Sequence, residues 1–288
     1  PMFNKRHIVR TIAATASILA LSFTAACGSG QSTASNSTDS DDITQQTYKP
    51  GKLTIATGQP AYEPWVMNDK PESGEGYEAA VAYAVADKLG FKKSDVVWTR
   101  TAFDTAIAPG AKDWDFNIQQ FGITDERKKA VDFSSSYYND SQSVVVKKDS
   151  KFANATKVSD LKDATVGVMV GTLAYDYAKA NIKDDIQTFN DDAALAQALD
   201  AGQIDALVTS TVECVYMVQS EQVKDAKVLG RLPDSEDKSG MGIVLPKDSK
   251  LTAAVTKAVD DLNADGTIKK LQDKWLAEYT TDLTELKK

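Results

Sequence analysis

The residue of this chain best suited to recognise a small anion is Arg127, which lies in the polar run of residues 123–134. The preceding residues 115–118 alternate as a strand does, so the run is interpreted as a strand end leading into a polar turn. A guanidinium there can donate two parallel, charge-assisted hydrogen bonds to a carboxylate. The alternative is a surface arginine that pairs with Asp125 or Glu126.

Histidine and cysteine are too scarce for several kinds of enzyme chemistry. The single histidine is His7, close to the amino end, and Cys214 is the only cysteine beyond Cys27. Imidazole-based zinc sites and Ser-His or Cys-His nucleophile systems are therefore excluded from the rest of the chain. The apolar neighbours of Cys214 favour a buried position in a helix. We predict no catalytic residue, no metal, no cofactor and no internal disulfide.

The amino end has the layout of a secretory signal. Lys5, Arg6 and Arg10 are followed by acid-free, mainly apolar residues 11–26, a stretch shorter than the ~20 residues of a spanning helix. Small residues directly before Cys27 resemble a bacterial lipobox, although Thr24 stands where leucine is usual. We predict a lipoprotein signal peptide over residues 1–26 and lipidation of Cys27; the alternative is an ordinary cleaved signal that leaves this thiol free.

Residues 27–47 are rich in small polar side chains, a composition that favours a flexible tether over a packed fold. Loss of residues 1–26 would remove three basic residues and no acid, which lowers the net charge from −8 to −11. An acidic surface argues against nucleic acid and against polybasic attachment to lipid headgroups. The expected location is outside the cytoplasm, anchored to the cell membrane through the lipid on Cys27.

Beyond the tether, strand-like and helix-like patterns alternate, which indicates an α/β fold. Strands are predicted at residues 52–56, 96–98, 115–118, 144–146, 165–170 and 205–208. A helix is predicted over residues 76–89, with Tyr77, Val81, Val85 and Leu89 on one face and Gly90 after its end. Further helices are predicted at residues 193–201 and along two apolar stripes between residues 251 and 275.

Several segments in register resemble the bacterial extracellular solute-binding proteins of family 3, the amino-acid receptors of ATP-driven importers. They are the run around Arg127, the Gly76-Tyr77-Glu78 signature (with Ala80 in place of its second acid), Gly171-Thr172, and residues 202–206 and 264–268. The resemblance implies a two-lobed periplasmic-binding-protein-like fold of type II with two hinge crossings. One lobe would comprise residues 48–139 plus 241–288, and the other residues 140–240.

The resemblance also implies a site between the lobes. Arg127 and the backbone N–H groups of Gly122, Thr172 and Leu173 would hold a carboxylate, the last two at the amino end of a helix. Taken without the resemblance, Gly171-Thr172 could equally be a plain turn and helix cap. Tyr62 would stack on the ligand, Phe103 would form an opposite wall, and Trp65 could line the same end.

Three positions depart from the family pattern and bear on the ligand. Gln119 and Gln120 replace two small residues, and Ser210 stands where many members hold the ligand's ammonium with an aspartate. Glu63, Glu78 or Glu213 would have to compensate, or the ligand is not a standard α-amino acid. Gln59 stands where receptors for basic amino acids carry an acid, which favours a neutral or polar ligand.

The predicted function is an extracytoplasmic substrate-binding lipoprotein of an ABC importer. It would bind a small amino acid or related carboxylate by hinge closure and then dock on a permease driven by an ATPase. Two alternatives remain open. One is a dehydratase of the cyclohexadienyl type on the same fold, and the other is a surface lipoprotein without a transport role.

Overall fold

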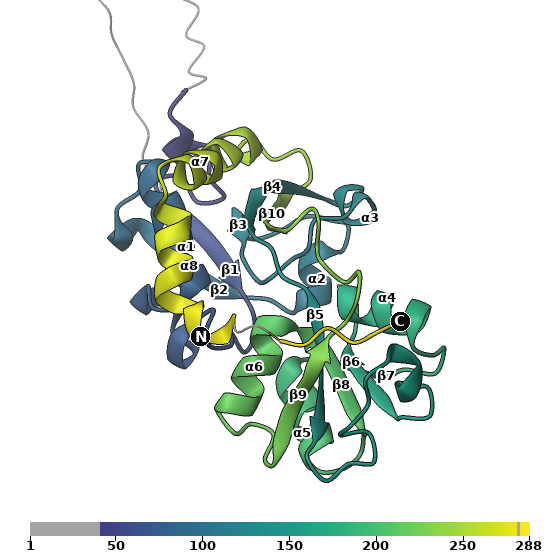
Figure 1. Cartoon of the computed structure of the whole chain (residues 1–288). Helices are drawn as coiled ribbons and strands as arrows, with labels where there is room; N and C mark the ends of the chain where they lie inside the picture. The colour runs from purple at the N-terminus through teal and green to yellow at the C-terminus, as the bar shows by residue number, and fades with distance from the viewer. Residues whose placement is uncertain (1–40, 281–282) are drawn as a thin grey trace, which may run out of the picture. The chain divides into compact units, whose positions relative to one another are not determined.

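The computed structural model describes residues 41–280 and 283–288, so the predicted signal peptide, Cys27 and most of the predicted tether lie outside the described residues. The described chain contains two five-stranded mixed sheets, each packed against its own helices (Figure 1). The predicted α/β fold with two lobes is confirmed.

The first sheet has the order β2-β1-β3-β10-β4. Its strands are β1 (Leu53–Thr57), β2 (Val96–Arg100), β3 (Phe116–Asn117), β4 (Val131–Tyr138) and β10 (Met241–Pro246). Strand β1 runs parallel to β2 and β3, whereas β10 is antiparallel to β3 and β4. The helices of this lobe are α1 (Tyr77–Lys88), α2 (Phe103–Ile107), α3 (Asp125–Lys128), α7 (Thr252–Ala264) and α8 (Thr267–Trp275).

The second sheet has the order β7-β6-β8-β5-β9. Its strands are β5 (Gln142–Lys147), β6 (Val166–Met169), β7 (Gln187–Phe189), β8 (Ala206–Ser210) and β9 (Ala226–Arg231). Strand β6 is parallel to β7 and β8, and β5 is antiparallel to β8 and β9. The helices here are α4 (Leu173–Asn181), α5 (Asp192–Asp200) and α6 (Thr211–Gln219). Helix α6 contains Cys214, which is buried as predicted.

Helix α1 shows how the sequence pattern sets the packing. The predicted stripe of Tyr77, Val81, Val85 and Leu89 is buried in the core of the first lobe. Gly76 precedes the helix with φ of 99°, and a Cβ on it would lie 2.5 Å from the carbonyl oxygen of Trp65. Only glycine therefore allows the helix to begin this close to the loop after β1.

The chain crosses twice between the sheets, as predicted. The first crossing is the short segment 139–141 between β4 and β5, and the second is segment 232–240 between β9 and β10. Two crossings let β10 complete the first sheet after the second has formed. The strands of the first sheet are therefore not contiguous in sequence, whereas β5 to β9 of the second sheet are.

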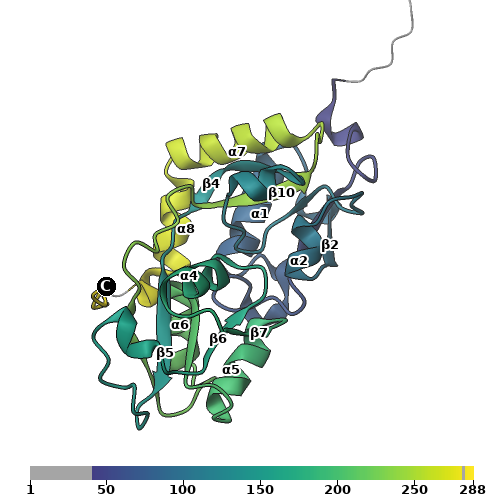
Figure 2. The same cartoon turned by 90° about the vertical axis from the view of Figure 1, so that its right-hand side faces the viewer.

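The carboxyl-terminal residues differ from the expectation that residues 241–288 belong to the first lobe. Leu286 is buried in the core of the second lobe, and its N–H donates to the carbonyl of Arg231 at 2.9 Å. The N–H of Arg231 donates to the carbonyl of Thr284 at 2.9 Å. Because β9 is the edge strand of its sheet, the tail pairs with an edge that would otherwise be open. Both views show the yellow tail reaching the second lobe (Figures 1 and 2).

The predicted tether also ends earlier than expected. Asp42 caps a 3₁₀ turn over Ile43–Gln45, and Ile43 packs against the core of the first lobe. The N–H of Tyr48 donates to the Asp115 carboxylate at 2.6 Å. The polar composition of this segment gave no sign of the packing of Ile43 or of the hydrogen bond to the buried Asp115. These two contacts hold the segment against the first lobe.

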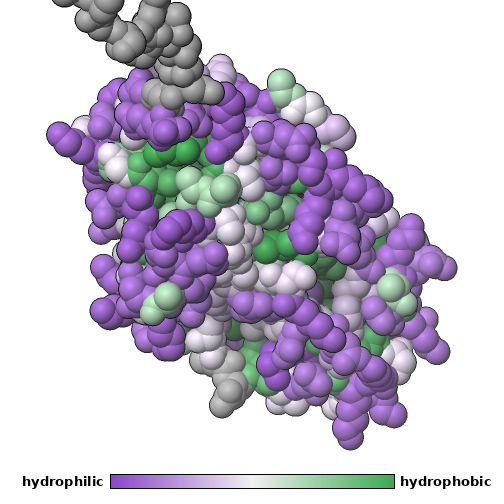
Figure 3. All heavy atoms as spheres, turned by 90° about the horizontal axis from the view of Figure 1, so that it is seen from above, coloured by the Kyte–Doolittle hydropathy of each residue, from purple (hydrophilic) through white to green (hydrophobic). Residues whose placement is uncertain are grey.

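The surface is largely hydrophilic on the face shown in Figure 3, and apolar atoms appear there mostly in hollows. Among the described residues, the exposed large apolar side chains are Tyr48, Val97 and Val170. Within residues 41–280 and 283–288, no helix is both long enough and apolar enough to span a membrane.

Candidate ligand-binding site

A cavity of about 210 Å³ is lined by residues of both lobes. Most of its lining lies at or just after the carboxyl ends of parallel strands: residues 57–62 at β1, residues 119, 120 and 122 after β3, 172–174 after β6, 190–192 after β7 and Ser210 at the end of β8. Parallel α/β sheets place ligands at this edge because the loops there converge. The two sheets therefore present equivalent edges to one cavity of small-molecule size.

All ten residues predicted as ligand contacts line this cavity: Gln59, Tyr62, Phe103, Gln119, Gln120, Gly122, Arg127, Thr172, Leu173 and Ser210. They come from six segments of the chain, so sequence proximity alone does not bring them together. Their contact with a ligand stays a prediction. Trp65, by contrast, is fully buried and does not line the cavity, although its Nε1 donates to Glu213, which does.

Arg127 lies in the one-turn helix α3, which Thr124 caps, and not in the polar turn expected from the sequence. Its Nη1 donates to the carbonyl of Gly122 at 2.7 Å, and its Nη2 donates to the carbonyl of Gly171 at 2.8 Å. The guanidinium lies 5.5 Å from the centre of the Phe103 ring. Burial lowers the pKa of Arg127, and the charges of Asp176 and Asp237 oppose that shift. One side chain thus joins both lobes at the cavity.

Gly122 lies beside Arg127 and close to residues outside the first lobe. A Cβ on this residue would lie 2.6 Å from Cδ1 of Leu173 and 2.9 Å from Oδ2 of Asp237. The first of these contacts is across the cavity, between the loop after β3 and the start of α4. A larger residue would therefore displace the ends of the Leu173 and Asp237 side chains from their observed positions.

Gln120 is held in an unusual backbone conformation by a buried acid. Its φ is 51°, a region that non-glycine residues rarely adopt. Its N–H donates to Oε1 of Glu78 at 2.7 Å, its side-chain amide donates to Oε2, and the hydroxyl of Tyr137 also donates to Oε1. Burial raises the pKa of Glu78 to about 7, while these hydrogen bonds oppose the shift. Glu78 thus positions Gln120 without lining the cavity.

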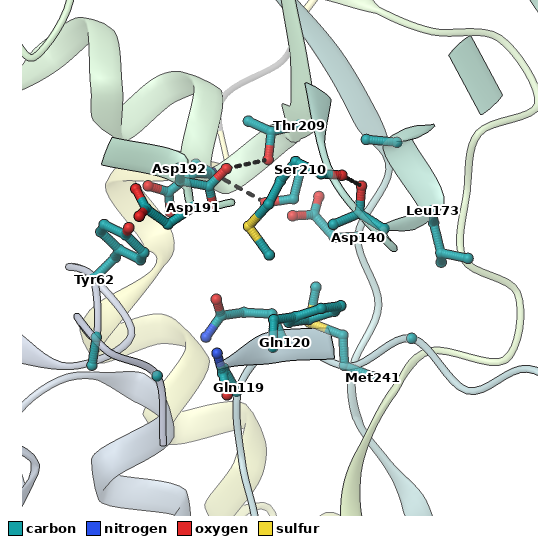
Figure 4. Close-up of a pocket in the computed structure, with 18 of the residues that line it drawn as sticks. Tyr62, Gln119, Gln120, Asp140, Leu173, Asp191, Asp192, Thr209, Ser210 and Met241 are labelled. Carbon is teal, nitrogen blue, oxygen red and sulfur yellow. Dashed lines mark hydrogen bonds between the residues drawn. The ribbon is translucent and has the colours of Figure 1, made fainter. Parts of the chain in front are cut away.

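Acids form one wall of the cavity. Figure 4 shows Tyr62, Asp191 and Asp192 together on one side, with Leu173 on the opposite side. Asp191 accepts from the N–H of Ala194 at 2.8 Å and so caps α5. Burial, reinforced by the charge of Asp191, raises the pKa of Asp192 to about 7. Burial and then the charge of Asp192 raise the pKa of Glu213, which lines the same cavity.

Asp140 is an acid next to Ser210. It lies in the first crossing between the lobes, and Ser210 donates a hydrogen bond to its carboxylate (Figure 4). Backbone N–H groups of Ser141 and Val212 donate to the same carboxylate at 2.7 and 3.2 Å. Burial raises the pKa of Asp140 to about 7. The serine that replaces the expected aspartate therefore has a carboxylate beside it, supplied by another segment.

Of the three acids expected to compensate for Ser210, Glu213 alone lines the cavity. Glu78 is occupied by Gln120 and Tyr137. Glu63 accepts from the N–H of Asn68 at 2.9 Å and from the hydroxyl of Tyr216 at 3.1 Å, outside the cavity lining. The acids that the sequence reading missed are Asp140, Asp191, Asp192 and Asp237. The signal for Asp191 and Asp192 was their place directly after a parallel strand.

The described residues contain no group of three or more His, Cys, Asp or Glu side chains arranged to hold a metal ion. The cavity instead combines one guanidinium, several amide groups, an aromatic wall and buried carboxyls. Such a site can recognise a small zwitterionic or cationic molecule through hydrogen bonds and charge.

The two lobes and the cavity between them define a binding protein of the periplasmic type. The chain belongs to the bacterial extracellular solute-binding proteins, family 3, whose model matches residues 53–278. It is 29% identical to the L-arginine-binding protein of Pseudomonas aeruginosa, with 80% of this chain and 88% of that protein covered. It is 30% identical to the L-cystine-binding protein TcyJ of Escherichia coli (strain K12), covering 76% of this chain and 81% of TcyJ.

Among solved structures, an ancestral arginine-binding protein bound to arginine is similar, with a TM-score of 0.67 and 31% identity. The match covers 78% of this chain and 98% of that one. The relatives named here are amino-acid solute-binding proteins, and the predicted family is confirmed.

Proposed function

We propose that this chain is the extracytoplasmic receptor of an ABC importer and that it binds a small amino acid or related carboxylate by hinge closure. One observation supports this most directly: the Arg127 guanidinium lies at the cavity and donates hydrogen bonds to carbonyls of both lobes. A ligand carboxylate bound in the cavity would contact the same guanidinium that links the two lobes. Binding and closure would then favour each other.

The proposed carboxylate end has donors to spare. A guanidinium carries five N–H donors, and two of those on Arg127 are used by Gly122 and Gly171. The amino end of α4, at Thr172 and Leu173, also lines the cavity. Helix amino ends favour anions because their N–H groups are unpaired and the helix dipole is positive there.

The cellular setting follows from the sequence and is part of the same proposal. Residues 1–26 are proposed to be a lipoprotein signal, Cys27 the lipid-bearing residue, and a tether to continue to about residue 41. The first lobe is proposed to comprise residues 48–139 with 241–280. The second lobe is proposed to comprise residues 140–240 together with the carboxyl-terminal tail, residues 283–288. The closed receptor would dock on a membrane permease, and we propose that it releases its ligand unchanged.

A thermal-shift screen of residues 28–288 against the twenty L-amino acids and L-cystine tests the proposal. At least one should raise the melting temperature, because binding to the folded state stabilises it by mass action. Calorimetry with that compound should show that Arg127→Ala weakens binding roughly 100-fold or more, since two charge-assisted hydrogen bonds are lost.

The matched control is Lys128→Ala, which removes the neighbouring exposed cation of α3 and should bind as the wild type does. Unchanged affinity in Arg127→Ala would remove this arginine from the site. If no compound stabilises the protein, the receptor proposal fails. Formation of product from prephenate or arogenate would instead support the dehydratase alternative.

A further inference from the structure

The charges that line the cavity are unequal. Among the described residues, five acids line it, Asp140, Asp191, Asp192, Glu213 and Asp237, and one basic residue does, Arg127. A zwitterionic ligand brings one carboxylate and one ammonium, so it would leave the excess of acid unchanged. The excess of acids therefore indicates a positively charged ligand only if some of these acids lack partners within the protein.

Three of the five acids have partners close by. Asp237 accepts from the N–H of Gly240 at 3.0 Å and interacts with the charge of Arg127. Asp140 accepts backbone N–H groups at the start of α6, and Asp191 caps α5. These carboxyls are accounted for by the fold.

Glu213 and Asp192 are different. The Glu213 side chain is buried, with the residue only 3% exposed, and its Oε1 has no hydrogen-bond partner among the described residues. Its Oε2 accepts from Nε1 of Trp65 at 3.3 Å. Asp192 receives a long hydrogen bond from Oγ1 of Thr209, at 3.5 Å. Two interacting carboxyls with little hydrogen bonding face one cavity, which is unfavourable unless a cation or protons occupy the space between them.

This pair lies away from the carboxylate end. Asp192 is on the same side as Tyr62, opposite Leu173 (Figure 4). Leu173 adjoins Gly122, whose carbonyl accepts from Arg127. The hydroxyl of Tyr62 accepts from the N–H of Ala193, the residue after Asp192, at 3.1 Å, and Tyr62, Asp192 and Glu213 all line the cavity. The face of the Tyr62 ring is in addition a favourable neighbour for a cation.

We propose that Glu213 and Asp192 form a cation subsite opposite Arg127, so that the ligand is an amino acid with a positively charged group at the far end of its side chain. The inference rests on the proposed receptor function and specifies its substrate class. It replaces the expectation of a neutral ligand, which considered Gln59 alone. Gln59 lines the cavity, but α5 and α6 supply the acids that the position of Gln59 lacks.

Calorimetry with L-arginine and L-citrulline tests the subsite. The side chain of L-arginine ends in a charged guanidinium, and that of L-citrulline ends in an uncharged urea group of nearly the same shape. The wild type should bind L-arginine at least 10-fold more tightly. Glu213→Gln should weaken L-arginine binding about 10- to 100-fold, the range expected for one charge-assisted hydrogen bond. Binding of L-citrulline should stay within about 2-fold. Asp192→Asn should act in the same direction, and Glu221→Gln, which changes an exposed acid just beyond α6, should change neither.

Thermal unfolding of each variant shows whether it folds. If Glu213→Gln does not fold, Asp192→Asn still tests the subsite. The same comparison between L-lysine and L-norleucine covers a shorter cationic side chain. The subsite proposal is wrong if both variants bind the cationic ligands as the wild type does. It is also wrong if they lose affinity equally for the cationic and the neutral member of a ligand pair. It is also wrong if L-glutamine or another neutral amino acid binds while L-arginine and L-lysine do not; the receptor proposal would survive that result. Absence of binding by any amino acid would contradict the receptor proposal itself.

Discussion

Replacement of Glu78 by glutamine should separate the charge of this buried acid from its hydrogen bonds. Glu78 is 0% exposed, and its Oε1 accepts from the N–H of Gln120 and the hydroxyl of Tyr137. The oxygen of a glutamine amide can take the place of Oε1 and accept both. Its NH₂ group would face the Gln120 amide, which can rotate by half a turn to present oxygen. Glu78→Gln therefore keeps the network and removes only the ionisable group.

The expected size follows from the pKa of Glu78, which burial raises from 4.5 to about 7. Between these values the folded protein binds more protons than the unfolded chain, so its stability falls as pH rises. At roughly 1.4 kcal/mol per pKa unit, ionised Glu78 costs about 3 kcal/mol at pH 8 and little at pH 5. Glu78→Gln should match the wild type at pH 5 and exceed its melting temperature at pH 8 by roughly 6–12 °C.

Calorimetric unfolding of residues 28–288 at pH 5 and pH 8, for wild type and variant, measures this difference. Glu75→Gln, which changes an exposed acid three residues earlier, should show no pH-dependent effect. Glu78→Ala should be less stable at both pH values, because it leaves the N–H of Gln120 without its acceptor. A Glu78→Gln protein less stable than wild type at pH 8 would refute the reasoning, since the hydrogen bonds to the carboxylate would then outweigh its burial.

Three further predictions follow from the tail, the interlobe contact and the acid wall. Leu286→Ala should lower the free energy of unfolding by about 2–5 kcal/mol, measured in urea, because it opens a cavity in the second lobe; an unchanged midpoint would contradict the tail's role. Gly122→Ala should weaken ligand binding about 10-fold through overlap with Leu173, seen by calorimetry, and a restored affinity is expected when Leu173→Ala is added. L-Arginine affinity should rise from pH 5.5 to pH 8 as Glu213 and Asp192 ionise, whereas L-citrulline affinity should stay constant. The titratable groups that interact with this pair are Tyr62, Glu78, Asp140 and Asp191. Parallel pH profiles for the two ligands would exclude Glu213 and Asp192 from binding the side-chain cation.

Local patterns were sufficient for the parts of the fold that depend on neighbouring residues. The stripe of α1 is set by a period of 3.6 residues, and Gly76 and Gly90 flank the helix with positive φ. The strand expected at residues 52–56 is β1, shifted by one residue. The ten predicted contacts converge because most of them follow a strand end or begin a helix, and the sheets bring those ends to one cavity; Arg127 reaches it from within α3.

Long-range pairing explains what the sequence did not reveal. Asp140 lies 70 residues before Ser210, and nothing near either residue shows that the crossing brings them together. Asp191 and Asp192 have the pattern of an ordinary helix cap, and Asp191 is one. Leu286 is one of only two apolar residues, with Leu283, in the polar and charged tail of residues 281–288. Its burial depends on the open edge of β9, which becomes visible only when the strand order is known.

The start of each helix in the second lobe lies at the cavity, and the first turns of these helices give its two ends opposite character. At α4 the residues that line the cavity are Thr172, Leu173 and Ala174, and the acid of the first turn, Asp176, is exposed and outside the lining. The positive end of that helix therefore remains available to an anion beside Arg127.

Helices α5 and α6 carry Asp192 and Glu213 in their first turns, and both side chains line the cavity. A helix amino end stabilises an acid placed there, so these carboxyls can remain at the surface of the cavity despite their burial. The acids reverse the charge that the helix ends alone would present. In the proposed receptor, the same strand-to-helix geometry would therefore supply an anion site at α4 and a cation site at α5 and α6, which together would favour a ligand charged at both ends.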